Sequence, residues 1–175
     1  MKRDLSIAFA ARDDRARAPP WRGLAAALVL TLAPGAASAR DLPAAGFTID
    51  DVVAWLQAGG YKTEVVQASN GGEPHVHTFS GDLGFGVYLY DCKDGRCGSI
   101  QFSAGYATHG HFDTSRMNQW NRDNRWCRGY FDSVNDPWVE MDVDLTPGGT
   151  YELLDDEFAT WRFSLKHFTD LYGLP

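Results

Sequence analysis

The chain has 175 residues, of which 44% are apolar and 13% aromatic, and its formal net charge is −7 at pH 7. This length is enough for one domain with a substantial core. The composition excludes a disordered chain and a membrane protein.

The first 39 residues have the pattern of a secretory signal peptide. Six Lys and Arg residues flank the amino-terminal side of an apolar run at residues 24–33, which is too short to span a bilayer. Pro34 and Gly35 follow, and Ala37-Ser38-Ala39 is typical of a cleavage site. We expect cleavage after Ala39, export to the periplasm or beyond, and no stable membrane insertion of the mature chain. A disordered basic tail and a retained anchor are the weaker alternatives.

Cleavage would change the charge balance of the protein. Six basic and three acidic residues would leave with the peptide, so 10 Lys and Arg would remain against 20 Asp and Glu, a net charge of −10. Such a surface repels phosphate backbones, and no basic stripe is interleaved with aromatic residues, so nucleic-acid binding is excluded. Export would also place the cysteines in an oxidising compartment.

The first half of the mature chain is predicted to contain one helix and four strands. Residues 40–46 are expected to form a short linker. Thr48 and Asp51 resemble a capping box at the start of a helix, which Gly59-Gly60 ends. Strands are predicted at residues 61–66, 75–80, 84–92 and 97–106.

The second half adds a helix, two strands and a longer helix. The shorter helix is expected to end near residue 124, and the strands follow at 126–132 and 138–145. This order, α-ββββ-α-ββ-α, predicts a single α+β domain over residues 47–175 with a largely antiparallel sheet. The last helix carries one continuous apolar stripe, formed by Leu154, Phe158, Trp161, Leu165, Phe168 and Leu171.

The stretch YDCKDGRCGSIQF contains two cysteines around a turn. If Cys92 faces Cys97 on antiparallel strands, Leu89 faces Ile100, and this register puts the large aliphatic side chains on one side and both sulfurs on the other. Directly opposed residues are close enough for a disulfide. The pattern therefore favours a Cys92–Cys97 disulfide that closes the hairpin tip.

Two other interpretations of these cysteines remain weaker. A thioredoxin-like redox centre has Cys-x-x-Cys at the start of a helix, whereas this spacing is Cys-x4-Cys in a hairpin. A zinc site would need two further ligands, and the hairpin tip offers only Asp91 and Asp94.

A second hairpin is predicted from the strands at 126–132 and 138–145. A register with Cys127 opposite Val143 places Arg128 opposite Asp142 on the outer face. Cys127 then points into the core and is expected to be a buried, inert thiol. An intermolecular disulfide is the alternative, and it requires Cys127 to be exposed.

Histidine pairs are the main candidates for metal ligands. His75 and His77 lie two residues apart on a predicted strand, so their side chains project from one face. His109 and His111 have the same spacing in a Gly-containing loop before a helix. A zinc or copper site would form if the two pairs met, but nothing in the sequence brings them together. Surface histidines without a ligand role are the preferred interpretation.

Acidic residues alternate with apolar ones along the last predicted strand. Glu140, Asp142 and Asp144 on one face suit a hard cation or an acid–base pair, although a solvated strand face is the commoner arrangement. We favour the solvated face. The chain contains none of G-x-S-x-G, a phosphate-binding glycine loop or H-E-x-x-H. We therefore predict a protein that is not an enzyme and needs no cofactor.

Three segments resemble the YbjN-type family, and the likeness extends over residues 47–171. They are MNQWNRDNRWCRGYFD, DPWVEMDVDLTPGG and the hairpin GFGVYLYDCKDGRCGSIQFSAGY. The resemblance implies a bacterial sensory-transduction regulator with a fold similar to type III secretion chaperones and without established catalytic residues. It also implies a module whose partner is another protein or a second copy of itself.

The predicted strands offer a surface for such a partner. By strand alternation, Trp126, Tyr130 and Trp138 share the outer face with Arg128. Aromatic residues and arginine are enriched at binding hot spots. We therefore predict these four residues as a partner surface, with a periplasmic metal-binding protein as the alternative function. A helix of the same domain covering this face is the competing interpretation.

Overall fold

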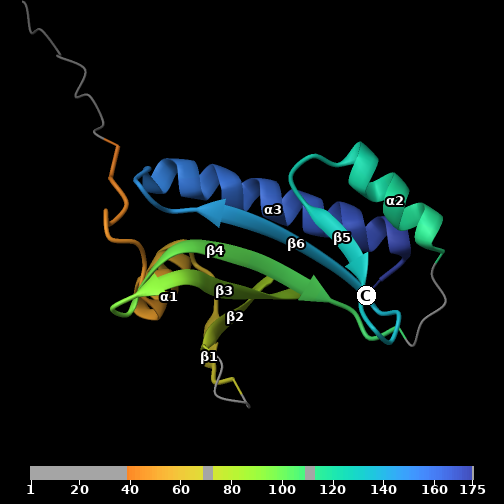
Figure 1. The fold of residues 1–175 in the computed structure, drawn as a ribbon, viewed down its shortest axis with the longest axis horizontal. Helices are drawn as coiled ribbons and strands as arrows, with labels where there is room; N and C mark the ends of the chain where they lie inside the picture. The colour runs from red at the N-terminus through yellow and green to blue at the C-terminus, as the bar shows by residue number, and fades with distance from the viewer. Residues whose placement is uncertain (1–38, 69–72, 109–112, 175) are drawn as a thin grey trace, which may run out of the picture. The chain divides into compact units, whose positions relative to one another are not determined.

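The computed structural model describes residues 39–68, 73–108 and 113–174, which belong to one compact unit (Figure 1). The predicted signal peptide, apart from Ala39, and the pair His109 and His111 lie outside the described residues. The described helices are α1 (Ile49–Ala58), α2 (Thr114–Asp123) and α3 (Tyr151–Tyr172), and the strands are β1 (Thr63–Val66), β2 (His75–Ser80), β3 (Leu83–Lys93), β4 (Arg96–Gly105), β5 (Arg128–Phe131) and β6 (Pro137–Asp144).

The strands form one antiparallel sheet of six strands in the order β1-β2-β3-β4-β6-β5. The order of helices and strands along the chain is the predicted one, and the α+β class is confirmed. The first four strands are neighbours in sequence and in space. The last two strands do not follow the order of the sequence. The second of them, β6, pairs with β4, and the short strand β5 lies outside it as an edge strand.

The core lies between one face of this sheet and the described helices. Phe102 of β4 packs against Trp55 of α1 and stacks on Trp161 of α3, with ring centroids 6.4 and 5.7 Å apart. α2 covers the same face, because a Cβ at Gly129 of β5 would lie 2.4 Å from the sulfur of Met117. Figure 1 shows α3 running along β6, with α2 beside β5. The opposite face of the sheet carries no described helix.

A side-chain cap starts α1 at the predicted place. At α1, the Asp51 amide donates to the Thr48 hydroxyl over 3.1 Å, and the Thr48 amide donates to the Asp51 carboxylate over 2.9 Å, which completes the capping box. The stripe of α3 is confirmed from Leu154 to Phe168 but not at Leu171, which is 37% exposed. Tyr172 takes its place in the core, because a period of 3.6 residues advances the buried face by four positions here.

The first hairpin has the predicted register, with Cys92 opposite Cys97, and the two sulfurs form a disulfide. The predicted side of the sulfurs is wrong. Cys97 is buried in the core, and with Cys92 and Leu89 it lines a small cavity beside the start of α1. The alternation breaks at Asp91, whose φ of 55° lies in the left-handed region, so that Asp91 rather than Cys92 follows Tyr90 on the outer face.

The second hairpin is displaced by two residues from the predicted register. Arg128 lies opposite Glu140, not Asp142, because a tight loop closes the hairpin at Asp132. The Asp132 carboxylate accepts the amides of Val134 and Asp136, over 3.0 and 2.9 Å. A shift of two residues preserves the face of every side chain. Cys127, which directly precedes β5, is buried as predicted, and burial raises the pKa of its thiol to about 11.

The segment that we expected to be a linker packs on the domain. Leu42 is buried, and its amide donates to the carbonyl of Gly149 over 2.9 Å. Phe47 is fully buried and exchanges two backbone hydrogen bonds with Cys97. These contacts attach the segment to the hairpin tip and to the start of α3.

Candidate functional site on the open face of the sheet

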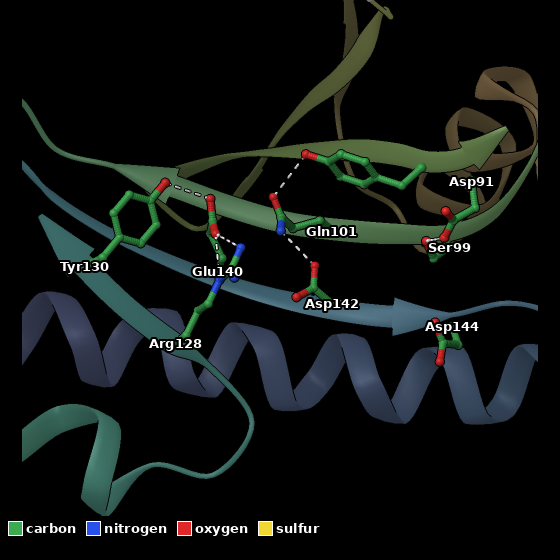
Figure 2. Close-up of a pocket in the computed structure, with 9 residues that line it drawn as sticks. Asp91, Ser99, Gln101, Arg128, Tyr130, Glu140, Asp142 and Asp144 are labelled. Carbon is green, nitrogen blue, oxygen red and sulfur yellow. Dashed lines mark hydrogen bonds and ion pairs between the residues drawn. The ribbon is translucent and has the colours of Figure 1, made fainter. Parts of the chain in front are cut away.

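The open face of the sheet contains a shallow depression of about 730 Å³, which we call the tyrosine–carboxylate hollow (Figure 2). Its walls come from four adjacent strands, β3, β4, β6 and β5, so that segments up to 54 residues apart in sequence contribute to it. It is lined by Tyr90, Asp91, Ser99, Gln101, Arg128, Tyr130, Glu140, Asp142 and Asp144.

Glu140 is the centre of the hydrogen-bond network at one end of the hollow. Its side chain is only 9% exposed although no described helix covers it. One carboxylate oxygen accepts Nε and Nη2 of Arg128, over 3.0 and 2.7 Å. The other accepts the hydroxyl groups of Tyr130, over 2.9 Å, and Ser103, over 3.3 Å. These bonds satisfy a charge that would otherwise be costly to bury.

A second network extends from β3 to β6. The hydroxyl of Tyr90 donates to Oε1 of Gln101 over 3.4 Å, and the amide nitrogen of Gln101 donates to Asp142 over 2.7 Å (Figure 2). At the disulfide end, Ser99 donates to Asp91 over 3.0 Å. Asp91, Glu140 and Asp142 therefore hold their neighbours in place by accepting hydrogen bonds.

Electrostatics keep the tyrosines of the hollow neutral and its arginine charged. Burial and the hydrogen bond to Glu140 raise the pKa of Tyr130 to about 12. Burial and the nearby carboxylates of Glu140 and Asp142 also raise the pKa of Tyr90. The hydrogen bond to Glu140 raises the pKa of Arg128. At neutral pH the hollow therefore presents phenol hydroxyls, carboxylates and one guanidinium.

Aromatic rings lie flat on the sheet beside the hollow. The Trp138 ring lies over Gly105, where a Cβ would be 2.3 Å from it, and the Tyr88 ring lies beside Gly86 in the same way. Tyr130 is parallel to Trp138, with an angle of 13° between the planes. Glycines on the strands therefore provide the space that these rings occupy.

The structure brings together three of the four residues predicted as a partner surface. Arg128 and Tyr130 line the hollow, and Trp138 lies beside Tyr130. Trp126 is elsewhere, because β5 begins only at Arg128 and strand alternation does not extend to it. Trp126 is 56% exposed and lines a separate depression next to Phe163 of α3.

The contribution of β3 and β4 to the site was not predicted from the sequence. Tyr90 and Gln101 were not predicted as site residues, because only the pairing of β6 with β4 brings them beside Asp142. A local signal was present in GFGVYLY and SAGY. In the first of these, Gly84 and Gly86 share the strand face of Tyr88 and Tyr90, which is typical of rings that lie on the backbone, whereas the Gly105 of SAGY lies under Trp138 of another strand.

The described histidines do not form a metal site. His75 stacks on Tyr88 with centroids 4.4 Å apart, and His77 makes an edge contact with Phe79 at 4.8 Å. Burial and the neighbouring His77 lower the pKa of His75. Within residues 39–68, 73–108 and 113–174, no group of three or more His, Cys, Asp or Glu side chains is arranged to hold a metal ion. His109 and His111 lie outside this set.

In the part of the chain that the structure describes, no helix combines the length and the apolar character needed to cross a membrane.

Comparison with known proteins identifies the family. No curated protein matches the sequence. A solved structure, "Crystal structure of YbjN, a putative transcription regulator from E. coli", has a similar fold, with a TM-score of 0.53 and 17% sequence identity over 76% of this chain and 96% of that chain. The YbjN family model, described as "Putative bacterial sensory transduction regulator", matches residues 48–170. The chain belongs to the YbjN family.

Proposed function

We propose that the mature chain is an exported regulatory module that binds another protein through the open face of its sheet and has no enzymatic activity. The observation that carries this proposal is the uncovered face itself, where the tyrosine–carboxylate hollow adjoins the flat rings of Tyr88 and Trp138. Large neutral aromatic groups beside a hydrogen-bonded arginine are the composition of binding hot spots.

The chemistry of the hollow supports binding rather than proton transfer. Glu140 accepts bonds from three side chains, so a general base at this position would first have to release them. The raised pKa values of Tyr90 and Tyr130 keep both phenols protonated at neutral pH. Fixed donors and acceptors of this kind suit the recognition of polar groups on a partner.

Charge favours a basic partner segment. The hollow is lined by the four carboxylates of Asp91, Glu140, Asp142 and Asp144, but by only one arginine. The mature chain would carry a net charge of −10. We expect a segment rich in Lys or Arg to dock there, with faster association at low ionic strength.

Export is supported by the pattern of residues 1–39 and by the Cys92–Cys97 disulfide, which oxidising compartments favour. The two features are independent, because one concerns targeting and the other concerns the redox state of the folded domain. Together they favour the periplasm or the outside of the cell as the place where the partner is met.

Site-specific photo-crosslinking in living cells tests the proposal. A benzophenone amino acid replaces Tyr90 in the hollow or, as the matched control, Phe163 on the exposed side of α3, which is 74% exposed. We expect a discrete adduct with one protein from position 90 and not from position 163. An adduct with a second copy of the chain would identify the partner as the protein itself. Adducts from position 163 alone would refute the proposed surface.

A further inference from the structure

The backbone nitrogen of Arg40 lies 3.2 Å from each carboxylate oxygen of Glu152, 112 residues further along the chain. Glu152 is the acidic residue in the first turn of α3. Arg40 is the residue that directly follows the predicted cleavage site after Ala39. The Arg40 nitrogen, which cleavage would convert into the new amino terminus, is therefore already in contact with a carboxylate.

Three further contacts fix Arg40 and its neighbour at this position. The carbonyl of Arg40 accepts the amide of Tyr151 over 2.9 Å, and the guanidinium of Arg40 lies over the Tyr151 ring at 3.7 Å. Asp41 forms an isolated β-bridge with Thr150, the N-cap of α3. The geometry at Glu152 therefore does not depend on a single hydrogen bond.

We propose that Glu152 is the binding site for the new amino terminus of the mature protein, the α-ammonium group of Arg40. This inference rests on the proposed export, which requires cleavage between Ala39 and Arg40. Water would add to the Ala39 carbonyl and the C–N bond would break. Ala39 would leave as a carboxylate that contains the oxygen of the water, and the Arg40 nitrogen would keep its own hydrogen and take both hydrogens of the water, which makes it an ammonium group.

Cleavage changes the interaction from a neutral hydrogen bond to an ion pair. The amide has one hydrogen to share between the two oxygens of Glu152, whereas an ammonium group has three. Charge-assisted hydrogen bonds are stronger than neutral ones. Hydrogen bonds from its own backbone amide and from Arg40 already hold the pKa of Glu152 below its usual range, so the carboxylate is ionised at neutral pH.

The amino terminus of α3 acts on the ammonium group in the opposite direction to Glu152. The first turn of a helix carries partial positive charge, which disfavours an ammonium group placed beside it. Glu152 compensates for this field in the mature protein. Without the carboxylate, the same ammonium group would face the helix terminus unpaired. Cleavage should therefore raise the stability of the fold when residue 152 is Glu. It should leave the stability unchanged or lower it when residue 152 is Gln.

Four proteins test the inference by their melting temperatures. One chain begins at Arg40 with a free amino group, and the other begins at Ala37, so that Arg40 keeps its amide. Each is made with Glu152 and with Glu152→Gln. With Glu152 at low salt, we expect the chain that begins at Arg40 to melt about 1–3 °C higher than the chain that begins at Ala37. With Glu152→Gln, the difference should vanish or change sign.

Two controls make the result specific. Asp50→Asn removes an acidic residue from the first turn of a different helix, α1, and should leave the difference between the two chains unchanged. Adding 1 M NaCl should abolish it, because the pair is exposed. Equal melting temperatures at low salt, or a difference that survives Glu152→Gln, would overturn the inference.

The mass of the protein exported by living cells separates this inference from the proposed export. A chain that begins at Arg40 supports both. A secreted chain that begins elsewhere, or an uncleaved one, would overturn the inference and the proposed processing together. A chain that begins at Arg40 but gains no stability over the chain that begins at Ala37 would overturn the inference alone.

Discussion

Arg128 and Glu140 lie directly opposite each other on β5 and β6, with Nη2 of the arginine 2.7 Å from the carboxylate. The two partners differ in environment, since the arginine side chain is 64% exposed and the glutamate side chain is 9% exposed. The arginine therefore covers a carboxylate that no described helix shields. This pair attaches the short edge strand β5 to the sheet and forms one end of the tyrosine–carboxylate hollow.

Replacing Glu140 with Gln should destabilise the fold. The change removes the charge that Arg128 and Tyr130 contact, and the free energy of unfolding should fall by about 1–2 kcal/mol, less than for a fully buried pair because Arg128 can turn to water. Urea denaturation measures the effect. Asp144→Asn, on the same strand face, is the control and should stay within about 0.5 kcal/mol. Equal effects of the two changes would contradict the role assigned to Glu140.

Tyrosine ionisation should differ between two sites in the fold. The pKa values of Tyr130 and Tyr106 are each raised to about 12, in Tyr130 by burial and the bond to Glu140 and in Tyr106 by burial alone. Glu140→Gln should therefore lower the pKa of Tyr130 and leave that of Tyr106 unchanged. NMR titration of ring carbons, assigned with Tyr130→Phe and Tyr106→Phe, distinguishes them. A parallel fall in both values would show that the substitution loosened the whole sheet.

These raised values also predict how stability depends on pH. A phenol whose pKa is higher in the folded protein than in the unfolded chain stabilises the fold fully below pH 10, the ordinary pKa. Between pH 10 and about pH 12 the unfolded chain releases its proton first, so this contribution is lost. Tyr130→Phe should therefore weaken the fall in stability between pH 10 and 12, measured by urea denaturation at each pH. An unchanged slope would contradict the prediction.

Removing the disulfide should destabilise the hairpin tip. On the chain-entropy account, a Cys92–Cys97 loop of this length contributes about 2 kcal/mol to the free energy of unfolding. Cys92→Ser combined with Cys97→Ser should lower the urea midpoint accordingly. Reductant should shift the wild-type protein toward the double variant and leave the variant unchanged. A wild-type midpoint that does not respond to full reduction would refute the prediction.

A methyl group at Gly105 should displace Trp138 from the sheet. The added Cβ would lie 2.3 Å from the ring, so the indole must move, and its 3.3 Å bond to Asp132 should be lost. Fluorine NMR of 5-fluorotryptophan, assigned with Trp138→Phe, should show a shifted resonance for Trp138 and little change at Trp161 in the core. Gly149→Ala is the control, because the nearest side-chain atom there is 3.4 Å away. A Trp138 resonance unchanged in Gly105→Ala would contradict the packing.

The remaining thiol should be unreactive in the native protein. Cys127 is buried, and burial raises the pKa of its thiol to about 11, so little thiolate exists at neutral pH. A thiol reagent at pH 8 should label one cysteine only after denaturation. Cys127→Ala should abolish this labelling. Rapid labelling of the native protein would revive the alternative of an intermolecular disulfide.

Local patterns were enough to predict the helices, the strands and, within regular strand backbone, the faces that side chains occupy. Thr48 and Asp51 marked the start of α1, and alternation placed Tyr130 and Trp138 on one face. The predicted faces are correct although the predicted register was wrong. The register differs by two residues, and side chains two residues apart on a strand point to the same face. Alternation failed where the backbone left the strand, at Asp91 and before Arg128.

The sequence by itself therefore determined the fold class, the register of the first hairpin, and the outer-face positions of Arg128, Tyr130 and Trp138. Only the tertiary structure decided that β6 pairs with β4, which brings Gln101 beside Asp142, and that residue 40 meets Glu152. Capping, periodicity and alternation act between residues a few positions apart, so a sequence displays them directly. Contacts between distant segments depend on how the whole core packs, so they cannot be predicted from a pattern within a few neighbouring residues.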